Sequence, residues 1–138
     1  MAASNVSPGQ KARPLSPHLQ IYRLTLTMLL SIVHRITGAG LYVGSLLLVW
    51  WLLAAATGPE AYALFADFIS SWLGRFILFG YSWALIHHML GGVRHLIWDT
   101  GRGFDLKVVE RLAWATLIGS LALTGLVWVA GYHIMGAL

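Results

Sequence analysis

The feature that most constrains this chain is a set of three long stretches without Asp, Glu, Lys or Arg. They are 36–57 with 22 residues, 76–93 with 18 and 112–138 with 27. A helix needs roughly 20 apolar residues to cross the hydrocarbon core of a bilayer. The second stretch must therefore extend into the apolar residues before Arg75, or carry that cation to the membrane surface. The sequence predicts an all-α integral membrane protein with three transmembrane helices.

The amino-acid composition excludes the soluble alternatives. Hydrophobic residues make up 58% of the 138 residues and charged residues only 10%, against about 25% charged residues in a typical soluble domain. A disordered chain would have too few apolar residues, and this one has an excess. The absence of cysteine excludes disulfides, thiolate metal sites and thiol nucleophiles. The net charge of +4 does not indicate nucleic-acid binding, because the Lys and Arg residues lie in small groups beside the apolar stretches.

The positions of Lys and Arg predict the orientation of the spans. Four of the nine precede Ile36, four lie between residues 94 and 111, and none follows residue 111. Such residues are enriched on the cytoplasmic side, so we expect the N-terminus and the second connection inside and the C-terminus outside. The expected segments are an inner arm 1–28, spans 29–57, 68–98 and 110–136, an outer loop 58–67 and an inner loop 99–109. Residues 61–71 are expected to form an interfacial helix or an extension of the second span, and no cleavable signal peptide is expected.

A first cluster of polar residues precedes the first apolar stretch. Ser31, His34 and Arg35 are spaced at i, i+3 and i+4, so they share one side of a helix. As an interfacial anchor, Arg35 would extend to lipid headgroups and Ser31 would bond to its own backbone. As a ligand site, they would supply a permanent cation and a hydroxyl donor to an anionic or carbonyl-bearing ligand. Three polar side chains on one side of an apolar helix favour the ligand site.

A second cluster surrounds a histidine in the second apolar stretch. One helical sector holds Ala84, His88, Gly91, Gly92 and His95, at about 100° per residue. His87 points away from this sector. The small neighbours leave a flat recess beside the His88 imidazole, so this residue is a candidate ligand of haem iron. The alternative is a small-residue seam that only packs helices. Zinc is a poor candidate because a structural site needs four N or S ligands.

A six-coordinate haem also needs an imidazole on the other side of its iron. His95 follows His88 by seven residues, roughly 10 Å along the helix axis, which is too far to serve the same iron. His34 precedes the first charge-free stretch, whereas His88 lies well inside the second. Counted from the inner boundary of each stretch, the two histidines differ in depth by roughly 10 Å. Either the second ligand comes from another polypeptide, or the haem is five-coordinate.

Three motifs together resemble the cytochrome b membrane-anchor subunits of succinate dehydrogenase, the respiratory complex II. They lie at 13–22, 31–38 and 88–99 and read RPLSPHLQIY, SIVHRITG and HMLGGVRHLIWD. The resemblance covers nearly the whole chain. It implies a bundle shared with the helices of a smaller companion anchor, and a complex completed by a flavoprotein and an iron–sulfur subunit. It also implies haem b as cofactor, ubiquinone as substrate, and the bacterial or mitochondrial inner membrane as location.

The resemblance also implies roles for individual residues. His88 resembles the axial ligand of the haem iron, with the opposite ligand on the companion anchor. Residues expected near the haem propionates are His34, Arg35 and His95, and those expected in the wall of the quinone pocket are Ser31, Ile32 and Arg35.

We do not expect this chain to be an enzyme by itself, because it offers no flavin site. Its expected role is to dock the extrinsic subunits and to hold a quinone near the terminal iron–sulfur cluster, with Ser31 bonding a quinone oxygen and Arg35 stabilising negative charge. Asp99 is a candidate proton relay, and its alternative role is a surface ion pair. The rival functions are the haem b anchor of a fumarate reductase or other quinone-linked dehydrogenase, and a haem-free structural anchor.

The orientation can be tested with reporters of membrane topology. A reporter fused after Leu138 is expected to be active only outside the cytoplasm or the equivalent inner compartment, and one inserted near Gly103 only inside, because the Lys and Arg residues hold the arm and the second connection inside. The reverse pattern of activities would show that the charge distribution does not set the orientation.

Overall fold

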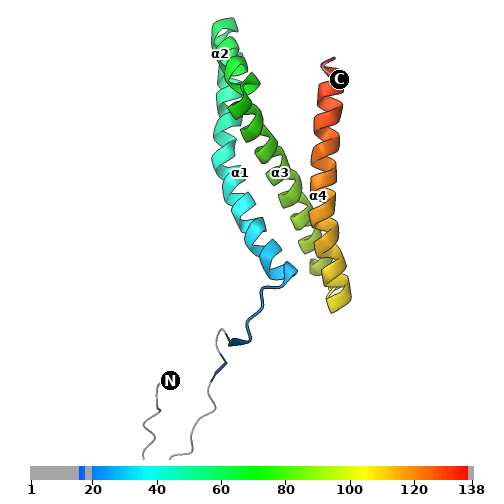
Figure 1. Ribbon diagram of the computed structural model, residues 1–138. Coiled ribbons are helices and arrows are strands. Elements are labelled where there is room, and N and C mark those ends of the chain that lie inside the picture. Colours follow the sequence, from blue (N-terminus) through cyan, green and yellow to red (C-terminus); the bar gives the residue numbers. More distant parts are fainter. Residues whose placement is uncertain (1–15, 18–19, 137–138) are drawn as a thin grey trace, which may run out of the picture.

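A computed structural model describes residues 16–17 and 20–136, and most of these lie in four α-helices (Figure 1). The helices are α1 (Leu26–Thr57), α2 (Pro59–Ser70), α3 (Trp72–Asp99) and α4 (Leu106–Ile134). The described part of the chain contains no strand. By length and composition, α1, α3 and α4 can each cross a membrane. The predicted all-α membrane protein with three spans is confirmed.

The first span is longer than its charge-free stretch. It begins at Leu26, because the Thr25 side chain accepts a hydrogen bond from a backbone amide of the first turn. This start lies three residues before the predicted one at residue 29, so the first polar cluster lies well inside the helix. The helix ends at Thr57, where Gly58 has a φ of 134°, a value that glycine adopts without steric cost. Pro59 then occupies the first position of α2, where its missing N–H removes no helical hydrogen bond.

The first connection is a helix of 12 residues, which agrees with the helix expected over 61–71 and begins within the segment 58–67 that is expected as a loop. The expected second span over 68–98 is also divided, because residues 68–70 end α2 and Ser71 begins α3 by accepting a hydrogen bond from the Gly74 amide at 3.1 Å. A Cβ atom on Gly74 would collide with the backbone of Phe68. A glycine at this position therefore lets α2 fold back against the start of α3.

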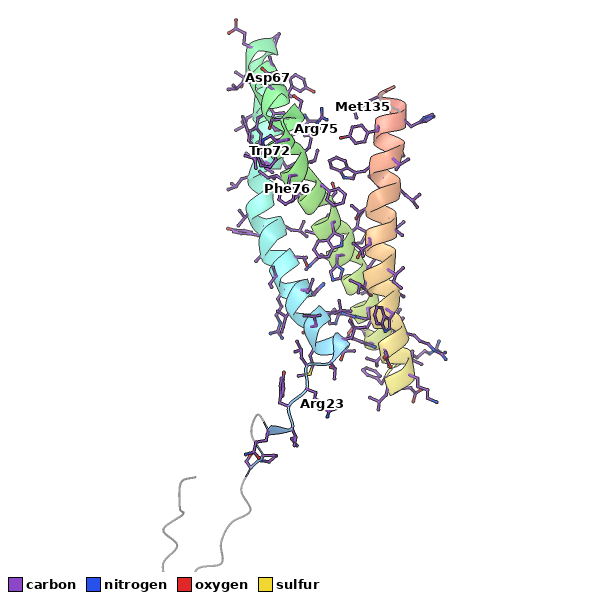
Figure 2. The ribbon with its side chains drawn as sticks, in the orientation of Figure 1. Arg23, Asp67, Trp72, Arg75, Phe76 and Met135 are labelled. Carbon is purple, nitrogen blue, oxygen red and sulfur yellow. The ribbon has the colours of Figure 1, made fainter. Side chains whose placement is uncertain are left out.

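At one end α1, α3 and α4 come close together, whereas at the other end α1, α2 and α3 stay together and only α4 stands apart (Figure 1). α1 contacts α3, and α2 packs against both. α4 crosses close to α3 near the turn that joins them and diverges from it toward the C-terminus (Figure 1). We call the end with this turn the predicted inner end. The opposite end, where Figure 2 labels Asp67, Arg75 and Met135, is the predicted outer end.

Small and polar side chains fill the contacts between the helices. The fully buried apolar residues of the described chain are Leu30, Ala54 and Ala113, whereas the buried polar or charged ones are Thr37, His87, Arg94, Thr116, Ser120 and Thr124. Large apolar residues lie mostly on the outside of the bundle. Membrane helices pack in this way, because lipid gives no hydrophobic gain for hiding large apolar side chains between them.

Candidate functional site

The centre of the site is a pair of stacked histidines from two spans. The ring centroids of His34 on α1 and His88 on α3 are 4.0 Å apart, and the ring planes differ by 3°. Each ring also lies over a glycine of the other helix. A Cβ atom on Gly91 would overlap the His34 ring, and one on Gly38 would lie 3.0 Å from the His88 ring. Two reciprocal imidazole–glycine contacts therefore build the crossing of α1 and α3.

This geometry corrects the depth expected for His34. The expected depth of His34 is counted from the start of the charge-free stretch at Ile36, whereas α1 begins ten residues earlier at Leu26. His34 therefore lies in the third turn of the helix, where its ring stacks directly on that of His88. Rings whose centroids lie 4.0 Å apart leave no room for a porphyrin between them, so it stays a prediction that His34 and His88 do not bind opposite sides of one iron.

Hydrogen bonds fix the proton of the His88 ring. The His88 Nδ1 atom lies 3.1 Å from the His34 carbonyl oxygen and 3.4 Å from the Thr37 hydroxyl oxygen. The Thr37 hydroxyl donates to the same His34 carbonyl at 2.9 Å, so its oxygen is left as an acceptor. The His88 Nδ1 atom therefore donates and carries the proton, which leaves the lone pair of Nε2 free.

The expected porphyrin recess beside His88 is only partly open. The His34 ring fills the space over Gly91, whereas a Cβ atom on Gly92 would meet no other atom within 4 Å. The sequence pattern located the small residues correctly. It did not reveal that one of them accommodates a histidine from the neighbouring span.

A third imidazole extends the pair toward the predicted inner end. The ring of His95 lies 5.3 Å from that of His34 and 5.2 Å from that of Trp98, and its side chain is exposed. His34 thus contacts both histidines of the predicted sector of α3. Its Nδ1 atom is buried and has no hydrogen-bond partner in the described part of the chain. The structure therefore brings His34, His88 and His95 together.

His87 faces the other way, as predicted from its position on the helix. Its side chain is 1% exposed, and its Nδ1 atom lies 3.2 Å from the hydroxyl of Ser120 on α4. The Ser120 hydroxyl donates to a backbone carbonyl of its own helix at 2.9 Å, so it accepts from His87. Sequence reasoning missed this contact, although Thr116, Ser120 and Thr124 recur at every fourth residue of an otherwise apolar span and are all buried.

Arg94 is a buried cation, although its position in the sequence places it among the charges of the predicted inner side. It is 5% exposed, and its Nε and Nη1 atoms have no hydrogen-bond partner among the described residues. Its guanidinium carbon lies 5.3 Å from the centre of the Trp98 ring, a cation–π contact. No sequence signal distinguishes this arginine from a solvated one at a helix end.

The predicted quinone residues lie apart from this buried centre. Ser31, Ile32 and Arg35 are exposed on α1, with 46% of the Ile32 side chain accessible. Asp99 is exposed at the end of α3, and its carboxylate forms no ion pair within the described part of the chain.

Three apolar spans with histidines at their crossing define a multi-pass membrane subunit. Residues 9–127 match the family described as succinate dehydrogenase/fumarate reductase transmembrane subunit. The succinate dehydrogenase cytochrome b556 subunit of Paracoccus denitrificans is 48% identical over 111 residues, which cover 80% of this chain and 85% of that protein. The cytochrome b556 subunit of Rickettsia felis is 38% identical over 85% of this chain and 91% of its own length.

A mitochondrial relative shows the same pattern. The succinate dehydrogenase cytochrome B subunit of Schizosaccharomyces pombe is 37% identical over 133 residues, which cover 90% of this chain and 72% of that protein. The chain therefore belongs to the succinate dehydrogenase/fumarate reductase transmembrane subunits, as a cytochrome b membrane anchor of the succinate dehydrogenase type. The resemblance found in its motifs is confirmed.

Substitution of the two adjacent glycines tests the crossing of α1 and α3. Gly91→Ala would place a Cβ atom in the His34 ring, so it is expected to lower the free energy of unfolding by about 1–3 kcal/mol. Gly92→Ala is the matched control, because its Cβ atom meets no other atom within 4 Å. Denaturant unfolding of the purified chain in detergent measures both. Equal stabilities of the two variants would contradict the reciprocal contact.

Proposed function

We propose that this chain is the haem b-binding membrane anchor of a succinate:quinone oxidoreductase, with His88 as one axial ligand of the haem iron. The observation that carries this proposal is the hydrogen bond from His88 Nδ1 to the His34 carbonyl oxygen. Metal-binding histidines commonly donate their second ring N–H to a carbonyl in this way, which fixes the tautomer and orients the ring. The relatives named cytochrome b support the cofactor.

The residues present fit a haem. His88 offers a deprotonated Nε2, and Gly92 leaves open space one turn further along α3. A bound haem b would accept and release single electrons. Stacking against His34 would hold the His88 ring in one orientation, and His34, Arg35 and His95 would contact the propionates at the predicted inner end. The opposite axial ligand would come from the companion anchor subunit, because the stacked His34 ring cannot supply it.

The same proposal covers the partners and the location. The arm and the connection between α3 and α4 would dock the flavoprotein and iron–sulfur subunits. Exposed apolar side chains on every span would contact lipid or the companion anchor. The membrane would be the bacterial or mitochondrial inner membrane, with the N-terminus inside and the C-terminus outside.

The ubiquinone site would use residues near the start of α1. Ser31 would donate a hydrogen bond to a quinone oxygen, Ile32 would form part of the apolar wall, and Arg35 would stabilise negative charge on the reduced ring. All three are exposed in the single chain, as expected for one wall of a pocket that neighbouring subunits complete. Asp99, also exposed at this end, would pass protons toward the site.

A fumarate reductase anchor is the second candidate, because the matching family includes both activities. The direction of catalysis depends on the relative reduction potentials of the quinone, the iron–sulfur clusters and the flavin. The clusters and the flavin would be bound by other subunits. A haem-free anchor is the third candidate, since the imidazole–glycine contacts pack the helices without any cofactor.

Substitution of the two adjacent histidines tests the ligand assignment. In the assembled complex, His88→Ala is expected to abolish or strongly perturb the b-type haem spectrum, because it removes the free Nε2. His87→Ala is the control and is expected to retain most of the haem, because His87 contacts Ser120 on the opposite side of α3. Visible spectroscopy per mole of complex measures both. An intact low-spin spectrum in His88→Ala, with loss of haem in His87→Ala, would reverse the assignment.

Two activities separate a quinone site from a structural anchor. Ser31→Ala and Arg35→Leu are expected to slow quinone reduction far more than electron transfer from succinate to a soluble dye, which bypasses the membrane pocket. Ser31→Ala would remove a hydrogen bond to the quinone worth about 0.5–1.5 kcal/mol, and Arg35→Leu would remove a charge-assisted one roughly twice as strong. Quinone reduction should therefore be slower in Arg35→Leu than in Ser31→Ala. Parallel loss of both activities, or loss of neither, would rule out the quinone role.

A further inference from the structure

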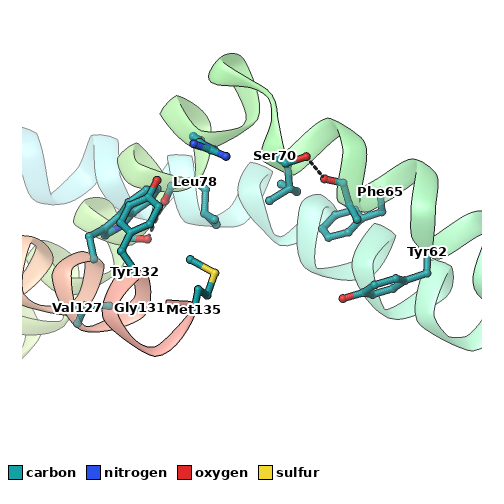
Figure 3. A pocket seen from close by; sticks show the side chains of 13 residues that line it. Tyr62, Phe65, Ser70, Leu78, Val127, Gly131, Tyr132 and Met135 are labelled. Atoms are coloured by element: carbon teal, nitrogen blue, oxygen red, sulfur yellow. Dashed lines mark hydrogen bonds between the residues drawn. The ribbon is translucent and has the colours of Figure 1, made fainter. Parts of the chain in front are cut away.

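A pocket opens at the predicted outer end, far from the histidine pair along α1 and α3. It has a volume of about 460 Å³ and lies between α2, α3 and α4 (Figure 3). This volume falls within the range of roughly 300–1,000 Å³ typical of small-molecule sites. The pocket arises because α4 contacts α3 closely through Ser120 and His87 and then diverges from it toward the C-terminus. No part of the proposed haem or quinone site lines it.

The lining is apolar except at its mouth. Aromatic and aliphatic side chains such as Phe65, Leu78 and Val127 form most of the wall (Figure 3). The hydroxyls of Ser70 and Ser82 donate to carbonyls of their own helices at 2.7 Å, so they are not free for a ligand. The remaining polar groups are the guanidinium of Arg75, the hydroxyls of Tyr62 and Tyr132 and the indole N–H of Trp128.

Arg75 gives the pocket an uncompensated positive charge. Its side chain makes no hydrogen bond or ion pair with any residue in the described part of the chain, and no acidic residue lines the pocket. Arg75 is also the fourth residue of α3, and the first turn of a helix carries a partial positive charge. An anion at this mouth would be attracted by the Arg75 guanidinium and by the N-terminal turn of α3. The pocket therefore suits an amphipathic occupant with an anionic head and an apolar chain.

We propose that this pocket binds a phospholipid of the adjoining leaflet. Its phosphate would lie on the Arg75 guanidinium, with the hydroxyls of Tyr62 and Tyr132 as further donors. One acyl chain would enter the apolar wedge between α3 and α4. The lipid would fill the space that the divergence of these two helices leaves open, and would thereby support the outer half of α4.

Two glycines of α4 supply a variant that blocks the pocket and its matched control. Gly131 lines the pocket, and a Cβ atom there would meet no other atom within 4 Å, so Gly131→Leu fills the space without a clash in the fold. Gly125 is equally open but does not line the pocket, so Gly125→Leu is the control. For the charge, Arg75→Gln is compared with Arg111→Gln, an exposed arginine at the start of α4.

The experiment counts the phospholipids bound to the assembled, delipidated complex by native mass spectrometry during titration with phosphatidylglycerol. Gly131→Leu is expected to bind one lipid fewer than the unmodified complex and than Gly125→Leu. Arg75→Gln is expected to weaken that one site about ten- to hundredfold, as for loss of a hydrogen bond to a charged group, while Arg111→Gln leaves it unchanged. Inorganic phosphate at millimolar concentration is expected not to displace the lipid, because it lacks the acyl chain.

Three results would overturn the proposal. Unchanged lipid binding in both Gly131→Leu and Arg75→Gln would show that no lipid occupies the pocket. Loss of binding in Gly131→Leu with no effect of Arg75→Gln would show that the occupant is not held by its phosphate. Loss of the companion anchor from the Gly131→Leu complex, but not from the Gly125→Leu complex, would show that the pocket seats a helix of that subunit.

Discussion

The packing of α1 against α3 depends on two reciprocal contacts, in each of which a histidine ring of one helix lies over a glycine of the other. The ring of His34 lies over Gly91, the ring of His88 lies over Gly38, and the two rings stack between the helices. In lipid, apolar side chains gain little by hiding from their surroundings, so close contact and hydrogen bonds must hold the helices together. The same contact orients His88, and so joins helix packing to the proposed cofactor chemistry.

The rotation of α3 about its own axis is fixed from both sides. His88 donates to the backbone of α1, whereas the adjacent His87 donates to Ser120 on α4. Neighbouring residues of a helix point about 100° apart, so satisfying both donors leaves a single rotational setting. A buried polar group without a partner costs about 1–3 kcal/mol, and two such groups on one turn make any other setting unfavourable. If His88 holds a haem iron as proposed, the precise orientation that it needs is thus provided in part by the contact of its neighbour His87 with α4.

Much of the fold could be predicted from the sequence, because bilayer thickness sets the length of a span and charged residues mark its limits. The assignment of His88 and His87 to different directions could also be predicted, since it needs only the helical repeat. The depth of His34 could not, because Thr25 begins the helix well before the charge-free stretch. The separate helix α2 depends on the contact of Gly74 with another helix, and the buried state of Arg94 depends on the packing of the folded chain around it. These features arise from pairing between distant segments, which spacing along one chain does not encode.

The contact between His87 and Ser120 also bears on the order in which the protein is made. The hydroxyls of Thr116, Ser120 and Thr124 donate to carbonyls of their own helix, so α4 enters the membrane with these donors already satisfied. α3 is synthesised first, and the His87 ring must remain unpaired in the bilayer, or held by the insertion machinery, until α4 arrives. A chain interrupted before residue 120 would keep that polar ring facing lipid.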